Sequence, residues 1–208
     1  MGLEYGSRSW PKCGTESYSL IYLASTSPRR KALLKKAGIA FRILKPDYEE
    51  GKKLNSPPSK IVQIHALKKA ESCVGQVKSG TILAADTVVF FEGEVIGKPK
   101  NMKTARLILG KLQGRWHSVY TGVAILKVVF GRVVNKIIFF EKTEVRLKKL
   151  TVGGIKNYFR KVNPLDKAGA YAIQSRQGGI VQRVKGLFSN AVGLPIEKML
   201  KKFPRDLC

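Results

Sequence analysis

Acidic residues are scarce in this 208-residue chain, which holds 14 Asp and Glu against 39 Lys and Arg. The formal net charge of +25 favours negatively charged partners, namely nucleic acids, anionic membranes and phosphorylated small molecules. The basic residues are scattered and form no long block of the kind found in nucleic-acid-binding tails. A nucleic-acid partner is therefore possible but not expected, and a solubilising charge spread over the surface is the alternative explanation.

Cysteine and histidine are also rare, which limits the chemistry open to the chain. The cysteines are Cys13, Cys73 and Cys208, with no C-x-x-C spacing, so a zinc ribbon and a dense disulfide framework are excluded. A reducing compartment is the default for such a chain. His65 and His117 have no second His or Cys at ligand spacing, so we expect neither a histidine metal site nor a Cys–His nucleophile pair.

Long hydrophobic runs are missing as well. No segment approaches the roughly 20 apolar residues that a membrane-spanning helix needs, so we expect no membrane association. Residues 1–17 lack an apolar core and any regular pattern, which predicts an N-terminal extension rather than a signal peptide. Residues 18–208 are expected to form a single domain, and the cytoplasm is the default location.

The composition, 44% hydrophobic and 25% charged, is that of a folded protein. Apolar and β-branched runs predict strands at 20–24, 41–44, 81–85 with a continuation at 88–91, 119–130, 133–146, 168–173 and 179–184. Capped or amphipathic segments predict helices at 28–37, 57–74, 101–112, 151–161 and 194–203. Because strands alternate with helices early and a hairpin follows, we expect an α/β fold with a mixed, twisted sheet flanked by helices.

Residues 25–30, with the sequence STSPRR, connect the first predicted strand to the first predicted helix. Ser27 at the N-cap and Pro28 at the first helical position define the start of that helix. A helix start offers free N–H groups to an anion, and two Ser hydroxyls and two guanidiniums add donors that suit phosphate. The alternative is an ordinary helix cap with two solvated arginines. The G-x-x-x-x-G-K-[ST] pattern of a P-loop is absent.

Asp86 closes the apolar run 81–85, which predicts a carboxylate at the carboxyl end of a strand. Ligands of open α/β sheets gather at such ends. There the carboxylate could bind a divalent metal or take a proton from water. Capping of the following turn is the competing explanation.

Two acidic and two basic residues elsewhere are further candidates. Glu49 and Glu50 lie in the loop after the predicted strand 41–44. If one of these carboxylates lay near Asp86, the two together would complete a Mg²⁺ site. The alternative is an exposed acidic loop. Lys69 and Lys98 could contact an anion, although most lysines are simply solvated.

Several blocks of the sequence, taken in order, resemble the Maf family of septum-formation-related proteins. The blocks are 23–30 (LASTSPRR), 84–89 (AADTVV), 97–99 (GKP), 112–123 (LQGRWHSVYTGV), 143–145 (TEV), 166–174 (DKAGAYAIQ) and 190–195 (NAVGLP). The resemblance extends over about residues 20–200. The order of the blocks makes it far more specific than any single block.

This resemblance implies a nucleoside triphosphate pyrophosphatase, which hydrolyses the bond between the α- and β-phosphates and releases a nucleoside monophosphate and pyrophosphate. It also implies an inosine triphosphatase-like fold with a cleft between two lobes, a divalent metal (Mg²⁺ or Mn²⁺), a house-cleaning role against non-standard nucleotides and a homodimer. Thr87 after Asp86 resembles the dTTP/UTP-preferring branch, so we expect dTTP, UTP and modified pyrimidine nucleotides as substrates. The competing classes are a basic nucleic-acid-binding protein and a nucleotide-binding regulator of cell division with little catalysis.

The resemblance and the motifs together place the functional side chains. Asp86, Glu50 and Lys98 are expected to be catalytic, and Glu50 and Asp86 are the expected metal ligands. The expected substrate-binding residues are Ser25, Ser27, Arg29, Arg30, Lys69, Thr87 and Gln174. Residues 47–50 read Asp-Tyr-Glu-Glu where many relatives have Asp-Glu, so the choice between Glu49 and Glu50 stays open. The role of Asp86 as base or as metal ligand also stays open.

Overall fold

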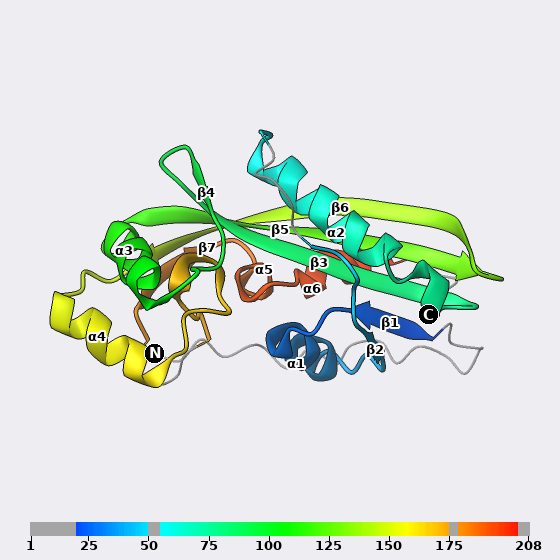
Figure 1. Cartoon of the computed structure of the whole chain (residues 1–208), viewed down its shortest axis with the longest axis horizontal. Coiled ribbons are helices and arrows are strands. Elements are labelled where there is room, and N and C mark those ends of the chain that lie inside the picture. Colours follow the sequence, from blue (N-terminus) through cyan, green and yellow to red (C-terminus); the bar gives the residue numbers. More distant parts are fainter. Residues whose placement is uncertain (1–19, 50–54, 175–178, 204–208) are drawn as a thin grey trace.

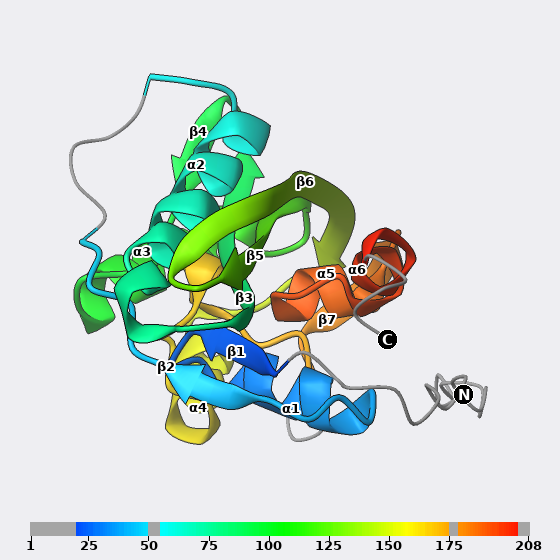
Figure 2. The ribbon, with the colours of Figure 1, turned by 90° about the vertical axis from the view of Figure 1, so that its right-hand side faces the viewer.

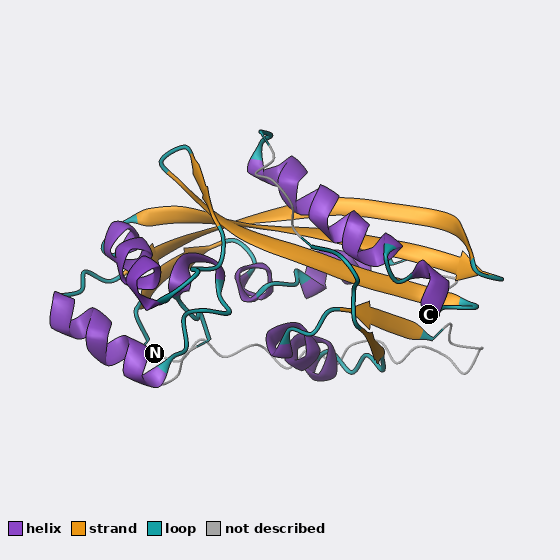
Figure 3. Ribbon diagram, viewed as in Figure 1, coloured by secondary structure: helices purple, strands orange, loops and turns teal. Residues whose placement is uncertain are grey.

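The computed structural model describes residues 20–49, 55–174 and 179–203. The expected extension at 1–17, Glu50, Cys13 and Cys208 all lie outside these ranges. The strands are β1 Ile21–Ala24, β2 Arg42–Leu44, β3 Gly80–Phe91, β4 Glu94–Ile96, β5 Trp116–Val129, β6 Arg132–Leu147 and β7 Val181–Lys185. The α-helices are α1 Pro28–Lys36, α2 Pro58–Glu71, α3 Met102–Leu112, α4 Val152–Lys161, α5 Phe188–Val192 and α6 Ile196–Lys202. Two short 3₁₀ helices are η1 Val74–Gln76 and η2 Ala168–Ala170 (Figures 1 and 3).

The strands form one mixed, twisted sheet in the order β2-β1-β3-β5-β6-β7, with β4 attached to β3. Strands β2, β1 and β3 are parallel neighbours, and the remaining pairs are antiparallel. The predicted mixed α/β fold is therefore confirmed. The long hairpin of β5 and β6 turns at Phe130 and Gly131, which both have positive φ. Glycine tolerates this conformation without strain, so the hairpin signal in the sequence was well founded.

Helices cover both faces of the sheet (Figure 2). Helix α2 lies on one face, where Ala66 and Ala70 pack against Ala84 and Ala124. Helices α1 and α6 lie on the other face around Leu83, and α3 and α4 cover the far end of that face. No helix among the described residues is both long and apolar enough to cross a bilayer.

Two of the described α-helices, α3 and α4, begin with a side-chain N-cap. The Asn101 side chain accepts a hydrogen bond from the Thr104 N–H at 2.9 Å, and Thr151 accepts one from the Gly154 N–H at 3.0 Å. Such caps typically stabilise a helix by about 1 kcal/mol. Ser27 occupies the N-cap position of α1, but its side chain makes no capping hydrogen bond.

Two expectations about strands were wrong. Asp86 does not end a strand: β3 continues without a break to Phe91, because β5 pairs with it from Gly80 to Phe90. Residues 168–173 do not form a strand but contain the 3₁₀ helix η2. Gly169 and Ala170 have φ values of 73° and 62°, which an extended strand does not allow.

Candidate active site

A cavity of about 440 Å³ opens at one edge of β3. Along this edge β1 pairs only with residues 81–83 and β4 only with residues 89–91. Residues 84–88 of β3 therefore have no strand partner on this side among the described residues. The cavity fills the resulting gap, and it is closed by α1, α2 and the segment around η2. A gap between two short edge strands lets side chains from both faces of β3 reach the same space.

Asp86 leaves β3 on the face that α2 covers. Successive strand residues point to opposite faces, so Asp86 shares its face with Ala84, which packs against α2. Lys69 of α2 reaches back to it, and the distance between Lys69 Nζ and Asp86 Oδ1 is 2.5 Å. The helix comes this close because Gly122, opposite Asp86 on β5, has no side chain. A Cβ at Gly122 would lie 2.3 Å from the backbone of Val62 in α2.

The Asp86 carboxylate is buried and charged. Burial by itself raises the pKa of Asp86, but the Lys69 ammonium, its hydrogen bond and the charge of Arg30 outweigh burial and hold the pKa below its ordinary value of 3.8. Lys69 binds Oδ1, while Oδ2 is inaccessible to solvent and has no hydrogen-bond partner in the described part of the chain. An unpartnered buried carboxylate oxygen is costly unless a ligand completes it.

This oxygen fits a divalent cation. Mg²⁺ is commonly held by one or two protein carboxylates together with substrate phosphates. Among the described residues no group of three or more His, Cys, Asp or Glu could hold a metal by itself. Asp86 can therefore supply one ligand. The second expected ligand, Glu50, lies outside the described residues, and the exposed Glu49 does not line the cavity.

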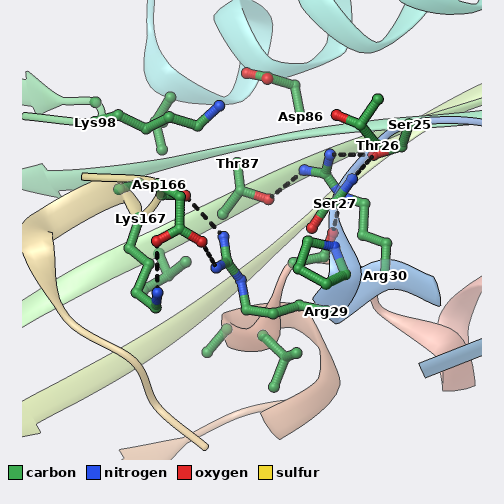
Figure 4. A pocket seen from close by; sticks show the side chains of 18 of the residues that line it. Ser25, Thr26, Ser27, Arg29, Arg30, Asp86, Thr87, Lys98, Asp166 and Lys167 are labelled. Atoms are coloured by element: carbon green, nitrogen blue, oxygen red, sulfur yellow. Dashed lines mark hydrogen bonds and ion pairs between the residues drawn. The ribbon is translucent and has the colours of Figure 1, made fainter. Parts of the chain in front are cut away.

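Thr87 leaves β3 on the opposite face and meets Arg30 of α1 (Figure 4). Arg30 donates from Nη2 to the Thr87 hydroxyl at 3.1 Å, from Nη1 to the Ser25 hydroxyl at 3.3 Å and from Nε to the Gly193 carbonyl at 2.8 Å. The Ser27 N–H donates to the same Ser25 oxygen at 3.2 Å. Arg30 thus joins two other expected substrate-binding residues, Ser25 and Thr87.

Arg29 points to the other side of the cavity and pairs with Asp166 (Figure 4). Its guanidinium donates to Asp166 Oδ2 at 2.9 Å and to the Asp166 carbonyl at 3.0 Å. Lys167 Nζ lies 2.6 Å from the other oxygen of Asp166. Hydrogen bonding and the charges of Lys167 and Arg29 overcome partial burial and lower the pKa of Asp166. Sequence reasoning gave no role to Asp166 or Lys167, although both lie in the block 166–174 that carried the family resemblance.

The structure brings most of the expected residues to this cavity. Its lining includes Ser25, Ser27, Arg29, Arg30, Lys69, Asp86, Thr87 and Lys98. Lys98 is exposed and makes no ion pair with a described residue, so its ammonium is available to an anion. Gln174 is exposed and lines a shallower adjoining hollow together with Arg29 and Asp166, not the cavity itself.

Tyr48 is a further lining residue that sequence reasoning missed. Its hydroxyl lies 2.7 Å from Nδ1 of His65, which is buried in α2 one turn before Lys69. This contact joins the loop after β2 to the helix that carries Lys69. No local signal in the sequence pairs a loop tyrosine with a helix histidine 17 residues away.

The chain is similar in sequence to several known proteins. The chain is 38% identical over 180 residues to a dTTP/UTP pyrophosphatase of Dictyoglomus thermophilum, covering 86% of this chain and 92% of that protein. It is 42% identical over 183 residues to a dTTP/UTP pyrophosphatase of Carboxydothermus hydrogenoformans, covering 88% and 96%. Among solved structures it is similar to the nucleoside-triphosphatase / dITP/XTP pyrophosphatase of Mycobacterium abscessus, with a TM-score of 0.45 and 13% identity over 86% of this chain and 91% of that one. Residues 20–205 match the family described as Maf-like protein, and the chain belongs to that family.

Proposed function

We propose that this protein is a nucleoside triphosphate pyrophosphatase that hydrolyses the bond between the α- and β-phosphates, with dTTP, UTP and modified pyrimidine nucleotides preferred. The relatives named dTTP/UTP pyrophosphatase support the reaction and the substrate class. The observation that carries the proposal is the charged, buried Asp86 with one unpartnered oxygen, surrounded by cationic side chains at an open cavity. The proposal treats residues 18–208 as one catalytic domain.

The cationic side chains neutralise the triphosphate. A triphosphate carries about four negative charges, which must be balanced before a nucleophile can approach phosphorus. Arg29 and Lys98 approach the cavity from different elements and would hold phosphate oxygens. The Ser25 hydroxyl and the N–H groups at the start of α1 add neutral donors. Lys69 stays with Asp86 and keeps that carboxylate ionised.

The metal in this proposal is Mg²⁺ or Mn²⁺, with Asp86 Oδ2 as one ligand. When bound, such an ion polarises phosphoryl oxygens and lowers the pKa of a coordinated water. A carboxylate whose pKa is held low is a weak base, so the electrostatics favour Asp86 as a ligand over Asp86 as the proton acceptor. Glu50 is proposed as the second ligand on the strength of the family resemblance.

The test is pyrophosphate release from a nucleotide panel with and without Mg²⁺ or Mn²⁺. We expect metal-dependent release from dTTP and UTP, and a decrease in kcat of at least ~10² for Asp86→Asn. Absence of release from every nucleotide with either metal would refute the proposal. Glu50→Gln compared with Glu49→Gln assigns the second ligand, because only loss of the ligand shifts the metal concentration needed for half-maximal rate.

The homodimer and the house-cleaning role belong to the same proposal and rest on the family membership. Light scattering of the purified chain measures its mass and so tests the homodimer. The house-cleaning role predicts that modified pyrimidine triphosphates are hydrolysed at least as fast as dTTP and UTP at equal concentration.

A further inference from the structure

Two hydroxyls of neighbouring strands, Thr87 in β3 and Thr121 in β5, connect the cavity wall to helix α5 on the same face of the sheet. Thr87 and Thr121 are direct partners in the β3–β5 register, and their Oγ1 atoms lie 3.0 Å apart. Thr121 is completely buried and does not line the cavity. Its Oγ1 also donates to the Asn190 carbonyl at 3.0 Å. Asn190 lies in α5, whose main chain is thereby tied to the sheet.

The direction of each hydrogen bond in this series follows from proton counting. A hydroxyl has one proton to donate and two lone pairs that accept. The proton of Thr121 goes to the Asn190 carbonyl, so Thr121 must accept at its contact with Thr87, and Thr87 must donate. Thr87 in turn accepts from Arg30 Nη2. The hydrogen bonds therefore run one way, from Arg30 through Thr87 and Thr121 to the Asn190 carbonyl, and we call this series the Arg30 relay.

The direction of these hydrogen bonds distinguishes the two hydroxyls that Arg30 contacts, Thr87 and Ser25, by whether their proton is already donated. The proton of Thr87 is committed to Thr121, so Thr87 has none to give to a bound nucleotide. Ser25 is the reverse case, because its oxygen accepts from both Arg30 and the Ser27 N–H. Its own proton is not used in any contact between described residues. Because Ser25 lines the cavity, this proton is left to donate to an acceptor there, such as a phosphate oxygen of a bound nucleotide.

We propose that Thr121 is a positioning residue, which acts through Thr87 to fix the Arg30 guanidinium and, through it, the donor direction of Ser25. Residue 87 then affects substrate binding by holding Arg30, not by donating to the nucleobase. The Arg30 guanidinium is held at its remaining edge by the Gly193 carbonyl, three residues after Asn190. The two ends of the relay thus meet the last turn of α5 and the glycine that follows this helix. This inference rests on the proposed function.

The closest matched control is Thr143 in the neighbouring strand. Thr143 is also completely buried, and its hydroxyl also donates to a main-chain carbonyl, that of Leu187, at 2.8 Å. The Thr143 hydroxyl also accepts from Nδ2 of Asn190 at 3.0 Å, but that amide keeps a second acceptor, the Val119 carbonyl at 3.2 Å. These hydrogen bonds of Thr143 involve neither Arg30 nor Thr87. Thr121→Val and Thr143→Val therefore each remove a buried hydroxyl near Asn190, and only the first removes the hydrogen bond to the Asn190 carbonyl that ends the Arg30 relay.

The experiment measures Tm, KM and kcat with dTTP and UTP for the wild type, Thr121→Val, Thr121→Ser and Thr143→Val. We expect both valine variants to lose Tm to a similar extent. Only Thr121→Val should raise KM, by about tenfold, which matches the loss of one hydrogen bond to a charged group. Thr121→Ser keeps the hydroxyl and should restore KM. An equal KM for the two valine variants would overturn the proposal, as would a raised KM in Thr121→Ser.

A further variant and a binding measurement distinguish failure of the relay from misfolding of the variant and from failure of the proposed function. If Thr121→Val does not fold, Thr87→Val breaks the same relay from the cavity side, and an unchanged KM in that variant contradicts the inference. Binding of a non-hydrolysable α,β-methylene analogue of dUTP is measured in parallel by calorimetry. If the wild type binds the analogue but hydrolyses nothing, the proposed function fails while the relay is still tested by the dissociation constants.

Discussion

Asp86 and Thr87 are neighbours in β3, yet their side chains leave opposite faces of the sheet and meet different helices. Asp86 contacts Lys69 of α2, and Thr87 contacts Arg30 of α1. Both still line one cavity, because on the side of β3 away from β5 this stretch pairs with no strand of the described residues. One dipeptide thereby joins a candidate metal ligand to a candidate phosphate-binding group.

The ion pair between Lys69 and Asp86 leads to a prediction about stability. Lys69→Met leaves a buried carboxylate without its partner, which should cost on the order of 3 kcal/mol in the free energy of unfolding at pH 7. Adding Asp86→Asn removes the uncompensated charge, so the double variant should be more stable than Lys69→Met. Urea unfolding measures both, with the exposed Lys60→Met of the same helix as control. A double variant less stable than Lys69→Met would contradict the claim that the uncompensated charge of Asp86 destabilises the single variant.

The same pair predicts a pH dependence. The pKa of Asp86 is lower in the folded than in the unfolded protein, so its stabilising contribution is present above the unfolded value near 3.8 and is lost as the pH falls through the folded value. We expect wild-type stability to fall more steeply than that of Asp86→Asn below pH 4. Unfolding curves between pH 3 and 6 provide the comparison, and parallel curves would count against the lowered pKa.

His117 predicts a second pH effect in a different window. Burial lowers the pKa of His117 to about 4, and its Nε2 lies 2.7 Å from the Tyr171 hydroxyl. The unfolded chain takes up a proton near pH 6.5 while the folded chain does not, so stability falls as the pH drops from 6.5 towards 4. The full effect is about 3 kcal/mol. His117→Gln should flatten the curve in this window, and an unchanged slope would show that His117 does not cause it.

Gly122 predicts a packing effect on the site. Gly122→Ala places a Cβ against the Val62 backbone, so α2 must move away from β5 and take Lys69 with it. We expect a loss of about 1–3 kcal/mol in stability together with a lower kcat. Gly110→Ala in α3 is the control, since nothing lies within 4 Å of its added Cβ and alanine favours a helix. Normal kcat in Gly122→Ala would mean that the Lys69–Asp86 geometry tolerates the shift.

Arg29 predicts a change in substrate binding. Arg29→Ala removes a guanidinium at the cavity and should raise KM for dTTP and UTP by about tenfold with a smaller change in kcat. The exposed Lys35→Ala on the same helix should leave KM unchanged, because that residue does not line the cavity. Steady-state kinetics at constant ionic strength separate the two variants. Equal effects would point to general charge attraction instead of a specific contact.

Much of the fold could be predicted because its signals are local. The helix at Met102–Leu112 has its Asn101 cap, and the β5–β6 hairpin has its glycine turn. The predictions were wrong where long-range pairing or backbone conformation decided the outcome. Asp86 was expected at a strand end, but pairing with β5 extends the strand beyond it. The segment 168–173 has strand-like composition, yet positive φ at Gly169 and Ala170 prevents a strand.

The family, the mixed α/β architecture and the set of charged and hydroxylated residues of the proposed phosphate site could all be identified from the amino-acid sequence. The hydrogen-bond partners of these residues emerge from the folded chain: Lys69 with Asp86, Arg29 with Asp166, and Arg30 with Ser25 and Thr87. Sequence motifs specify side-chain chemistry and local backbone form, but they do not specify which distant residues come together. Apart from Ser25, which is five residues from Arg30, these partners are 17 to 137 residues apart, and they are brought together by strand register and by how closely a helix can approach the sheet.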